Sequence, residues 1–230
     1  MSGPNNIVLF DIDGTLVATD GAGSSAMGRA FEDEFGVAGA FDGIPMAGRT
    51  DRGILDAAAT RAGLTLGESE RRRFRARYFT RLQEALPEPG RANRVLPGVR
   101  PLLEALAPRE DTFLALLTGN CEEGARLKLE HFDLWRYFRC GAFGDEMQDR
   151  RDLFSVAMAR AQACGAPDVP AEFVLVVGDT ELDVACAASA GARSVAVATG
   201  PSSPAALRQA GADVVLEDLA DVGAFLQLLR

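Results

Sequence analysis

The chain has 230 residues, 47% of them hydrophobic, and a mean hydropathy of +0.03, so it can bury one substantial core with a smaller second domain. The net charge of −9 argues against a nucleic-acid-binding protein, whose binding surface would be basic. No apolar run reaches the roughly 18 residues of a membrane-spanning helix, and the N-terminal segment lacks the pattern of a secretory signal. We therefore expect a cytoplasmic protein that binds neither nucleic acid nor a membrane.

The first predicted element is a buried parallel strand at residues 6–10, a short apolar run that ends at an aspartate. The next stretch differs, with three amphipathic helical patterns and little strand signal between them. Apolar residues at helical spacing mark these three patterns, around residues 27–35, 54–62 and 74–86. Glycine and proline punctuation at residues 21–23 and 96–98 suits two hinge strands. We expect an inserted helical cap domain at residues 18–96.

After this insertion, apolar strand patterns and helical patterns alternate to the end of the chain. The predicted strands lie at residues 112–117, 173–177, 194–198 and 213–216, and the predicted helices at 101–106, 122–130, 151–163 and 181–190. Such alternation predicts an α/β fold. We expect a doubly wound parallel (Rossmann-like) sheet formed by residues 1–17 and 97–230.

Two acids follow the first predicted strand, in the string IVLFDIDGTLV. Asp11 and Asp13 alternate, so an extended chain through Ile12 would direct both carboxylates to the same side. One could then act as a nucleophile while the other handles the proton of the leaving group. An Asp-Gly turn with incidental acids would explain a bare pair equally well, but the full string favours catalysis.

A second polar group follows the predicted strand at residues 112–117. Thr118, Gly119 and Asn120 precede a helix, and a hydroxyl with exposed backbone N–H groups at a helix start can bind an anion. The same residue types are also ordinary helix caps. The residues alone leave both interpretations open.

A third group follows the predicted strand at residues 173–177. Asp179 and Asp183 are four residues apart, which brings two acids together at the start of a helix. Mg²⁺ prefers oxygen ligands and commonly takes one or two protein carboxylates. The alternative is a helix-capping aspartate with a favourable acid in the first turn.

The string DIDGTL resembles the first motif of the haloacid dehalogenase superfamily, and the other two groups follow in that family's order, over residues 7–214. The resemblance implies that Asp11 attacks phosphorus to form an aspartyl phosphate and that Asp13 is general acid and then general base. It also implies that Gly14 and Thr15 form the loop at the phosphate. Phosphate oxygens would be bound by Thr118 and by the backbone of Gly119 and Asn120.

The same resemblance implies a Mg²⁺ site formed by Asp11, the main-chain oxygen of Asp13, and Asp179, with Asp183 orienting the site from further out. Members of the family usually have a lysine shortly before the last motif, and this chain has none there. Arg150 occupies the matching position, with Arg151 as the alternative, and arginine can supply the same charge.

Lys128, the only lysine of the chain, follows the second motif, and we expect a structural role for it. Relatives that cleave phosphonates need a lysine in the cap, and residues 18–96 contain none. Dehalogenating relatives lack the second acid of the first motif, which is present here as Asp13. Both comparisons favour phosphoryl chemistry.

The helical insertion resembles the C1-type cap of phosphoglycolate-phosphatase-like members, which closes over the site and selects the substrate. Within it, Arg49 could bind a substrate carboxylate or a second phosphate, or could simply be solvated. An arginine cluster lies around Phe74 and Tyr78, and we expect it to form the exposed face of a cap helix. The cluster consists of Arg71, Arg72, Arg73, Arg75 and Arg77.

The leading hypothesis is a Mg²⁺-dependent phosphatase that hydrolyses a small phosphorylated metabolite, with 2-phosphoglycolate as the first compound to test. A sugar-phosphate mutase of the same superfamily and a catalytically weak regulatory protein are the alternatives. We expect a monomer or a homodimer. Because the motif residues are common to the superfamily, they do not identify the physiological ester or the pathway.

Overall fold

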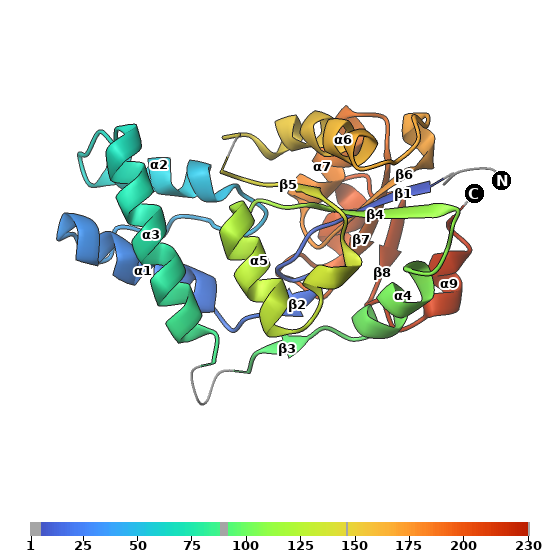
Figure 1. Ribbon diagram of the computed structural model, residues 1–230, viewed down its shortest axis with the longest axis horizontal. Helices are drawn as coiled ribbons and strands as arrows, with labels where there is room; N and C mark the ends of the chain where they lie inside the picture. Colours follow the sequence, from blue (N-terminus) through green and yellow to red (C-terminus); the bar gives the residue numbers. More distant parts are fainter. Residues whose placement is uncertain (1–5, 88–91, 146, 230) are drawn as a thin grey trace.

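A six-stranded parallel sheet forms the centre of the fold (Figure 1). The structure is a computed structural model that describes residues 6–87, 92–145 and 147–229. The strand order is β5-β4-β1-β6-β7-β8. The strands are β5 (Gly141–Ala142), β4 (Thr112–Leu117), β1 (Asn6–Phe10), β6 (Val174–Gly178), β7 (Arg193–Val197) and β8 (Val214–Leu216).

The three strands that precede the motif residues are neighbours at the centre of this sheet. Phe10, the last residue of β1, lies opposite Leu116 of β4 and Val177 of β6. The carboxyl ends of the three strands are therefore level with one another. Ligands of open α/β sheets bind at this edge, so the register brings the three predicted motifs together there.

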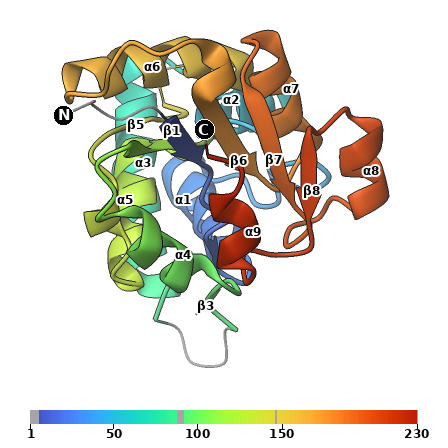
Figure 2. The same ribbon diagram turned by 90° about the vertical axis from the view of Figure 1, so that its right-hand side faces the viewer.

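Helices cover both faces of the sheet, because the strands are apolar on both sides. Val8 and Phe10 of β1 belong to a cluster on one face, and Ile7 and Leu9 belong to a cluster on the other. The first face is covered by α4 (Val99–Leu106), α5 (Glu122–His131) and α9 (Val222–Leu226), and the second by α6 (Leu153–Ala163) and α7 (Glu181–Ser189). In Figure 2, α4 and α9 lie below the sheet and α6 and α7 above it. The predicted doubly wound α/β fold is confirmed.

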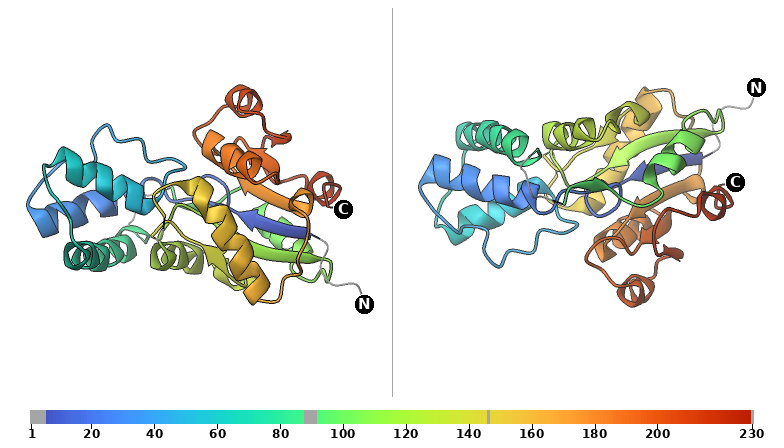
Figure 3. Two further views of the ribbon diagram at one scale, coloured as in Figure 1. Left: turned by 90° about the horizontal axis from the view of Figure 1, so that it is seen from above. Right: turned by 90° about the horizontal axis from the view of Figure 1, so that it is seen from below.

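Three helices between β1 and β4 pack around a separate apolar cluster that includes Phe31, Phe74 and Leu82. They are α1 (Ala22–Phe35), α2 (Asp51–Arg61) and α3 (Glu68–Ala85), which we call the helical insertion. Figure 3 shows them to one side of the sheet. Two short antiparallel strands, β2 (Val17–Ala18) and β3 (Arg94–Val95), flank the insertion. The division into domains at residues 18–96 stays a prediction, and residues 1–5, 88–91, 146 and 230 lie outside the described part.

The arginine-rich side of α3 is exposed only in part: Arg72, Arg73 and Arg77 are exposed as predicted, whereas Arg71 and Arg75 are half-buried. Phe74 and Tyr78 are buried, whereas Arg73 and Arg77 both pair with Glu34 of α1. The two arginine side chains are about half exposed, so these ion pairs contribute little to stability. The apolar stripe therefore determines how α3 packs.

Element ends and very short elements differ from the sequence predictions. The predicted helix at 151–163 begins as a 3₁₀ turn, Arg150–Asp152, before α6. The strands β6 and β7 are displaced by one residue, and β5, α8 (Pro204–Gln209) and α9 were not predicted. The three elements that were not predicted are too short to show a helical or strand period in the sequence. Further 3₁₀ turns lie at Trp135–Tyr137 and Ala171–Phe173.

Among the helices that the structure describes, none combines the length and the apolar character that crossing a membrane would require.

Candidate active site

The loop after β1 holds Asp11 and aligns the first motif with the third. The Asp11 amide donates a hydrogen bond to the Val177 carbonyl, and the Asp11 side chain is buried. Gly14 has a φ of +76°, and a Cβ atom there would lie 2.3 Å from a carboxylate oxygen of Asp179. Only glycine allows this approach. The Thr15 hydroxyl donates to the same Asp179 carboxylate at 3.1 Å. Gly14 and Thr15 thus position Asp179, and their predicted role at the phosphate stays a prediction.

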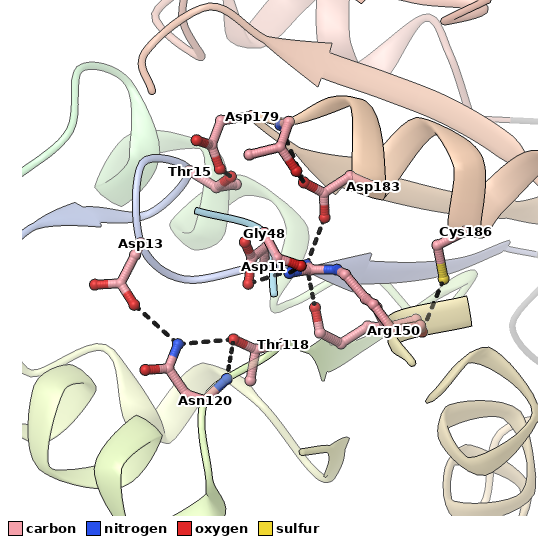
Figure 4. Close-up of polar contacts among 12 residues, drawn as sticks. Asp11, Asp13, Thr15, Gly48, Thr118, Asn120, Arg150, Asp179, Asp183 and Cys186 are labelled. Atoms are coloured by element: carbon pink, nitrogen blue, oxygen red, sulfur yellow. Dashed lines mark hydrogen bonds and ion pairs between the residues drawn. The ribbon is translucent and has the colours of Figure 1, made fainter. Parts of the chain in front are cut away.

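Three buried carboxylates meet at the carboxyl edge of the sheet (Figure 4). One oxygen from each of Asp11, Asp179 and Asp183 lies within 4.8 Å of the others. Burial is the main cause that raises the pKa of Asp11 to about 6 and the pKa of Asp179 to about 9, and neighbouring carboxylates add to both shifts. Burial and mutual repulsion therefore disfavour the ionised forms of these carboxylates.

Arg150 supplies the positive charge beside this cluster. Its guanidinium lies 3.1 Å from an oxygen of Asp11, also pairs with Asp183, and donates to the Leu117 carbonyl. Arg151 is exposed and pairs with Asp149. Of the two arginines that the sequence offers, Arg150 is the one placed at the predicted nucleophile.

The donor set fits a divalent cation that prefers oxygen ligands. With all three carboxylates ionised, one guanidinium would leave two negative charges uncompensated, and buried charges need partners. The ligand type favours Mg²⁺, Ca²⁺ or Mn²⁺ over softer metals. In Asp183, one oxygen accepts from the Thr180 amide and hydroxyl while the other pairs with Arg150, which suits a residue that orients the site. Asp11 and Asp179 are the better candidate ligands.

The second motif connects the two acids of the first. Thr118 is fully buried at the end of β4, and its hydroxyl oxygen accepts from the Asn120 amide at 3.2 Å and from Asn120 Nδ2 at 2.9 Å. The hydroxyl proton of Thr118 is donated to Asp11. Asn120 Nδ2 also donates to Asp13 at 2.8 Å. The observed bonds join Thr118 to Asp11 and Asn120 to Asp13. Phosphate binding by Thr118, Gly119 and Asn120 stays a prediction.

Lys128 is a residue whose importance we did not predict. Its Nζ atom lies 2.6 Å from Asp13 Oδ2 and 2.6 Å from Asn120 Oδ1, and its side chain is only 5% exposed. The expected structural role does not account for a buried ammonium beside a motif carboxylate. The helical period could have indicated that Lys128 is buried, because Lys128 lies on the same buried stripe of α5 as Gly124 and Ala125.

A cavity of about 290 Å³ lies between the motif residues and the helical insertion. Its core side includes Asp11, Asp13 and Lys128, and its insertion side includes Met27 and Tyr78. A small ester fits a space of this size. The insertion therefore contributes one wall of the candidate active site.

The first residue of α2 and the segment before this helix are bonded directly to the core at this cavity. The Asp51 amide donates to the Gly119 carbonyl at 2.7 Å, and the Asp51 carboxylate accepts from the Cys121 amide at 2.9 Å. Burial raises the pKa of Asp51 to about 6. The Gly48 carbonyl accepts from Arg150 at 3.2 Å. These bonds hold the insertion over the motif residues.

Arg49 lies in this segment and lines the cavity, and its guanidinium donates to the Pro45 carbonyl at 3.4 Å. The side chain is half-buried and contacts its own loop. Substrate binding by Arg49 stays a prediction.

Known proteins are similar to this chain over most of its length. A phosphoglycolate phosphatase of Rhodospirillum rubrum is 32% identical over 224 residues, which cover 95% of this chain and 90% of that protein. A crystal structure of a hydrolase from Pseudomonas syringae has a TM-score of 0.67 at 24% identity and covers 97% of this chain and 98% of that one. A predicted phosphoglycolate phosphatase from Haemophilus somnus has a TM-score of 0.69 at 22% identity, with coverage of 99% and 100%.

The family described as haloacid dehalogenase-like hydrolases matches residues 8–197, a range that contains all three motifs and Arg150. That match, the full-length relative and the positions of the acids agree with one another, and this chain belongs to the haloacid dehalogenase-like hydrolase family.

Proposed function

We propose that this protein is a Mg²⁺-dependent phosphatase that hydrolyses small phosphomonoesters through an aspartyl phosphate on Asp11. The observation that carries the proposal is the buried Asp11 carboxylate beside the Arg150 guanidinium and Asp179, in the cavity between the core and the helical insertion. A nucleophile paired with a fixed cation suits phosphoryl transfer, where positioning and charge stabilisation supply most of the catalysis.

In the first step, an oxygen of Asp11 attacks phosphorus, the bond to the ester oxygen breaks, and Asp13 gives a proton to the departing alcohol. In the second step, Asp13 takes a proton from the water that attacks the same phosphorus, and free phosphate leaves Asp11. Arg150 stays beside Asp11 and offsets the charge of the phosphoryl oxygens. A divalent cation held by Asp11, the Asp13 main chain and Asp179 would add further charge stabilisation.

The proposed substrate is a small anionic ester, with 2-phosphoglycolate as the first candidate. A relative that covers 95% of this chain is described as a phosphoglycolate phosphatase. The cavity of about 290 Å³ suits a small leaving group, and Arg49 on its border would suit a carboxylate. The cytoplasmic location and the state as a monomer or homodimer stay predictions.

Two alternatives use the same core differently. A sugar-phosphate mutase would return the phosphoryl group to a sugar, and a regulatory protein would turn over slowly or not at all. The missing motif lysine is the reason to consider a weak enzyme, and the Arg150 guanidinium beside Asp11 supports the active phosphatase instead.

The test is a panel of phosphorylated metabolites that includes 2-phosphoglycolate and hexose phosphates, assayed for free phosphate and for isomerised sugar, with Mg²⁺ and with chelator. We expect Mg²⁺-dependent phosphate release from small carboxylated esters. Isomerisation of a hexose phosphate without phosphate release would favour the mutase. Inactivity towards the whole panel would contradict both enzyme hypotheses.

A further inference from the structure

We propose that Lys128 is a positioning residue that holds Asp13 for proton transfer to the leaving group. The inference rests on the proposed function, because it assigns a partner to the general acid of that reaction. It begins from the contact between the only lysine of the chain and Asp13.

The two oxygens of Asp13 have different surroundings. Oδ2 accepts from Lys128 Nζ at 2.6 Å and from Asn120 Nδ2 at 2.8 Å, whereas Oδ1 has a single long contact with Thr19 at 3.5 Å. Two short bonds fix one oxygen and leave the other for the substrate. The Asp13 side chain is 41% exposed and the Lys128 side chain 5%, so the ammonium lies behind the carboxylate on the buried side.

Lys128 is itself held on several sides. Its Nζ atom donates to Asn120 Oδ1 at 2.6 Å, and Asn120 is bonded to Thr118, which donates to Asp11. A Cβ atom at Gly23 of α1 would lie 3.2 Å from Nζ, so the insertion packs directly over the ammonium. The bonds form one continuous network from Lys128 to the proposed nucleophile, which fixes both acids relative to each other.

Asp13 has to reach the ester oxygen in a defined geometry, because proton transfer requires hydrogen-bond distance to that atom. Without Lys128, the carboxylate keeps the bond from Asn120 and the long contact with Thr19, and it gains rotational freedom. The loss should depend on the leaving group. An alkoxide needs a proton in order to leave, whereas the carboxylate that leaves acetyl phosphate does not.

The experiment measures kcat/KM of the Mg²⁺-loaded enzyme and of K128M with three small esters. 2-Phosphoglycolate and ethyl phosphate both release an alcohol, and acetyl phosphate releases acetate. The ratio kcat/KM reports the step in which the leaving group departs and not the later hydrolysis of Asp11. General acid catalysis contributes roughly 10²–10⁴-fold. We expect K128M to lose about 100-fold with both alkyl esters and only a few-fold with acetyl phosphate.

Two further variants complete the design. K128R keeps a cation and should recover part of the alkyl activity. R126M removes an exposed cation of α5 that pairs with Glu130, and it should behave like the wild type with all three esters. If K128M does not fold, K128Q keeps a donor in the buried site, and its loss with alkyl esters relative to acetyl phosphate is judged in the same way.

Three results would overturn the inference. An equal loss with all three esters indicates a general structural role. A loss with 2-phosphoglycolate but not with ethyl phosphate indicates that Lys128 binds the substrate carboxylate directly. Wild-type rates in K128M indicate no role. If the wild type releases phosphate from none of the panel, the proposed function itself fails, and that outcome is recognised before any variant is compared.

Discussion

A guanidinium nitrogen of Arg150 lies 3.1 Å from a carboxylate oxygen of Asp11, and both side chains are buried. Bonds to the carbonyls of Gly48 and Leu117 hold the arginine in place. A cation fixed in advance beside a nucleophile needs no reorganisation when charge develops on the phosphoryl group. This contact supports the proposal that Arg150 takes the place of the lysine that the sequence lacks at this motif.

Replacing Arg150 should therefore be much more damaging than replacing its neighbour. We expect R150A to lower kcat by roughly 10²-fold or more, the cost of removing one fixed donor from a reaction centre, and R150K to lower it less. R151A removes only an exposed pair with Asp149 and should leave kcat unchanged. Steady-state kinetics, with thermal unfolding as the check on folding, compare the three. Equal losses in R150A and R151A would refute the assignment.

Binding of Mg²⁺ should stabilise the protein more at high pH than at low pH. The pKa of Asp179 is raised to about 9, against an unfolded value near 3.9. Below the unfolded pKa, Asp179 is protonated in both states and costs the folded protein nothing. As the pH rises from there towards 9, the unfolded chain loses this proton more readily, so the free energy of unfolding falls. The metal-free protein should lose stability over that interval, and Mg²⁺ should restore it by replacing the proton.

Thermal unfolding at pH 5 and pH 8, with Mg²⁺ and with chelator, measures this effect. At 100 times Kd, a ligand of the folded state contributes about 2.7 kcal/mol, which corresponds to a Tm increase on the order of 5–10 °C for a chain of this length. We expect an increase of this size at pH 8, a smaller one at pH 5 and none in D179N. An equal increase in D179N would place the metal elsewhere.

Docking of the insertion should depend on Gly48. Its φ is +70°, and a Cβ atom there would lie 2.5 Å from the Thr180 hydroxyl. G48A should lower kcat/KM by roughly 10-fold or more, because a misplaced segment near the site disturbs the reacting geometry. The matched control is G63A, with a φ of +69° and nothing within 4 Å of the added Cβ.

Both variants carry a similar backbone strain of about 1 kcal/mol. G48A adds the close contact with Thr180, so its Tm should fall at least as far as that of G63A. Only G48A should lose activity. If G63A loses as much activity as G48A, backbone strain and not docking of the insertion is responsible.

The sequence predicted the features that depend on long or strongly patterned segments. The strand at Asn6–Phe10 and the strand at Thr112–Leu117 have the predicted bounds, because each is a buried apolar run ended by a polar motif residue. The convergence of Asp11, Thr118 and Asp179 also followed from the pattern, because parallel strands present their carboxyl ends at one edge.

Contacts that depend on packing between distant segments could not be predicted. The helical period of α5 indicates that Lys128 is buried, but its contact with Asp13 requires α5 to lie against the loop after β1. The bond from Asp51 to Gly119 likewise depends on how the helical insertion docks. Helical periodicity shows that a side chain is buried but does not identify its partner.

The most direct test of the proposed nucleophile is to stop turnover in acid and to locate the phosphoryl group by mass spectrometry, with the Asp11→Asn variant beside the wild type. We expect one phosphoryl group on Asp11 in the wild type. In D11N we expect none, with at least about 10³-fold lower turnover. D168N alters an exposed acid that accepts only from Gln162 and should behave like the wild type. A D11N variant that folds and still releases phosphate at the wild-type rate would contradict the covalent mechanism.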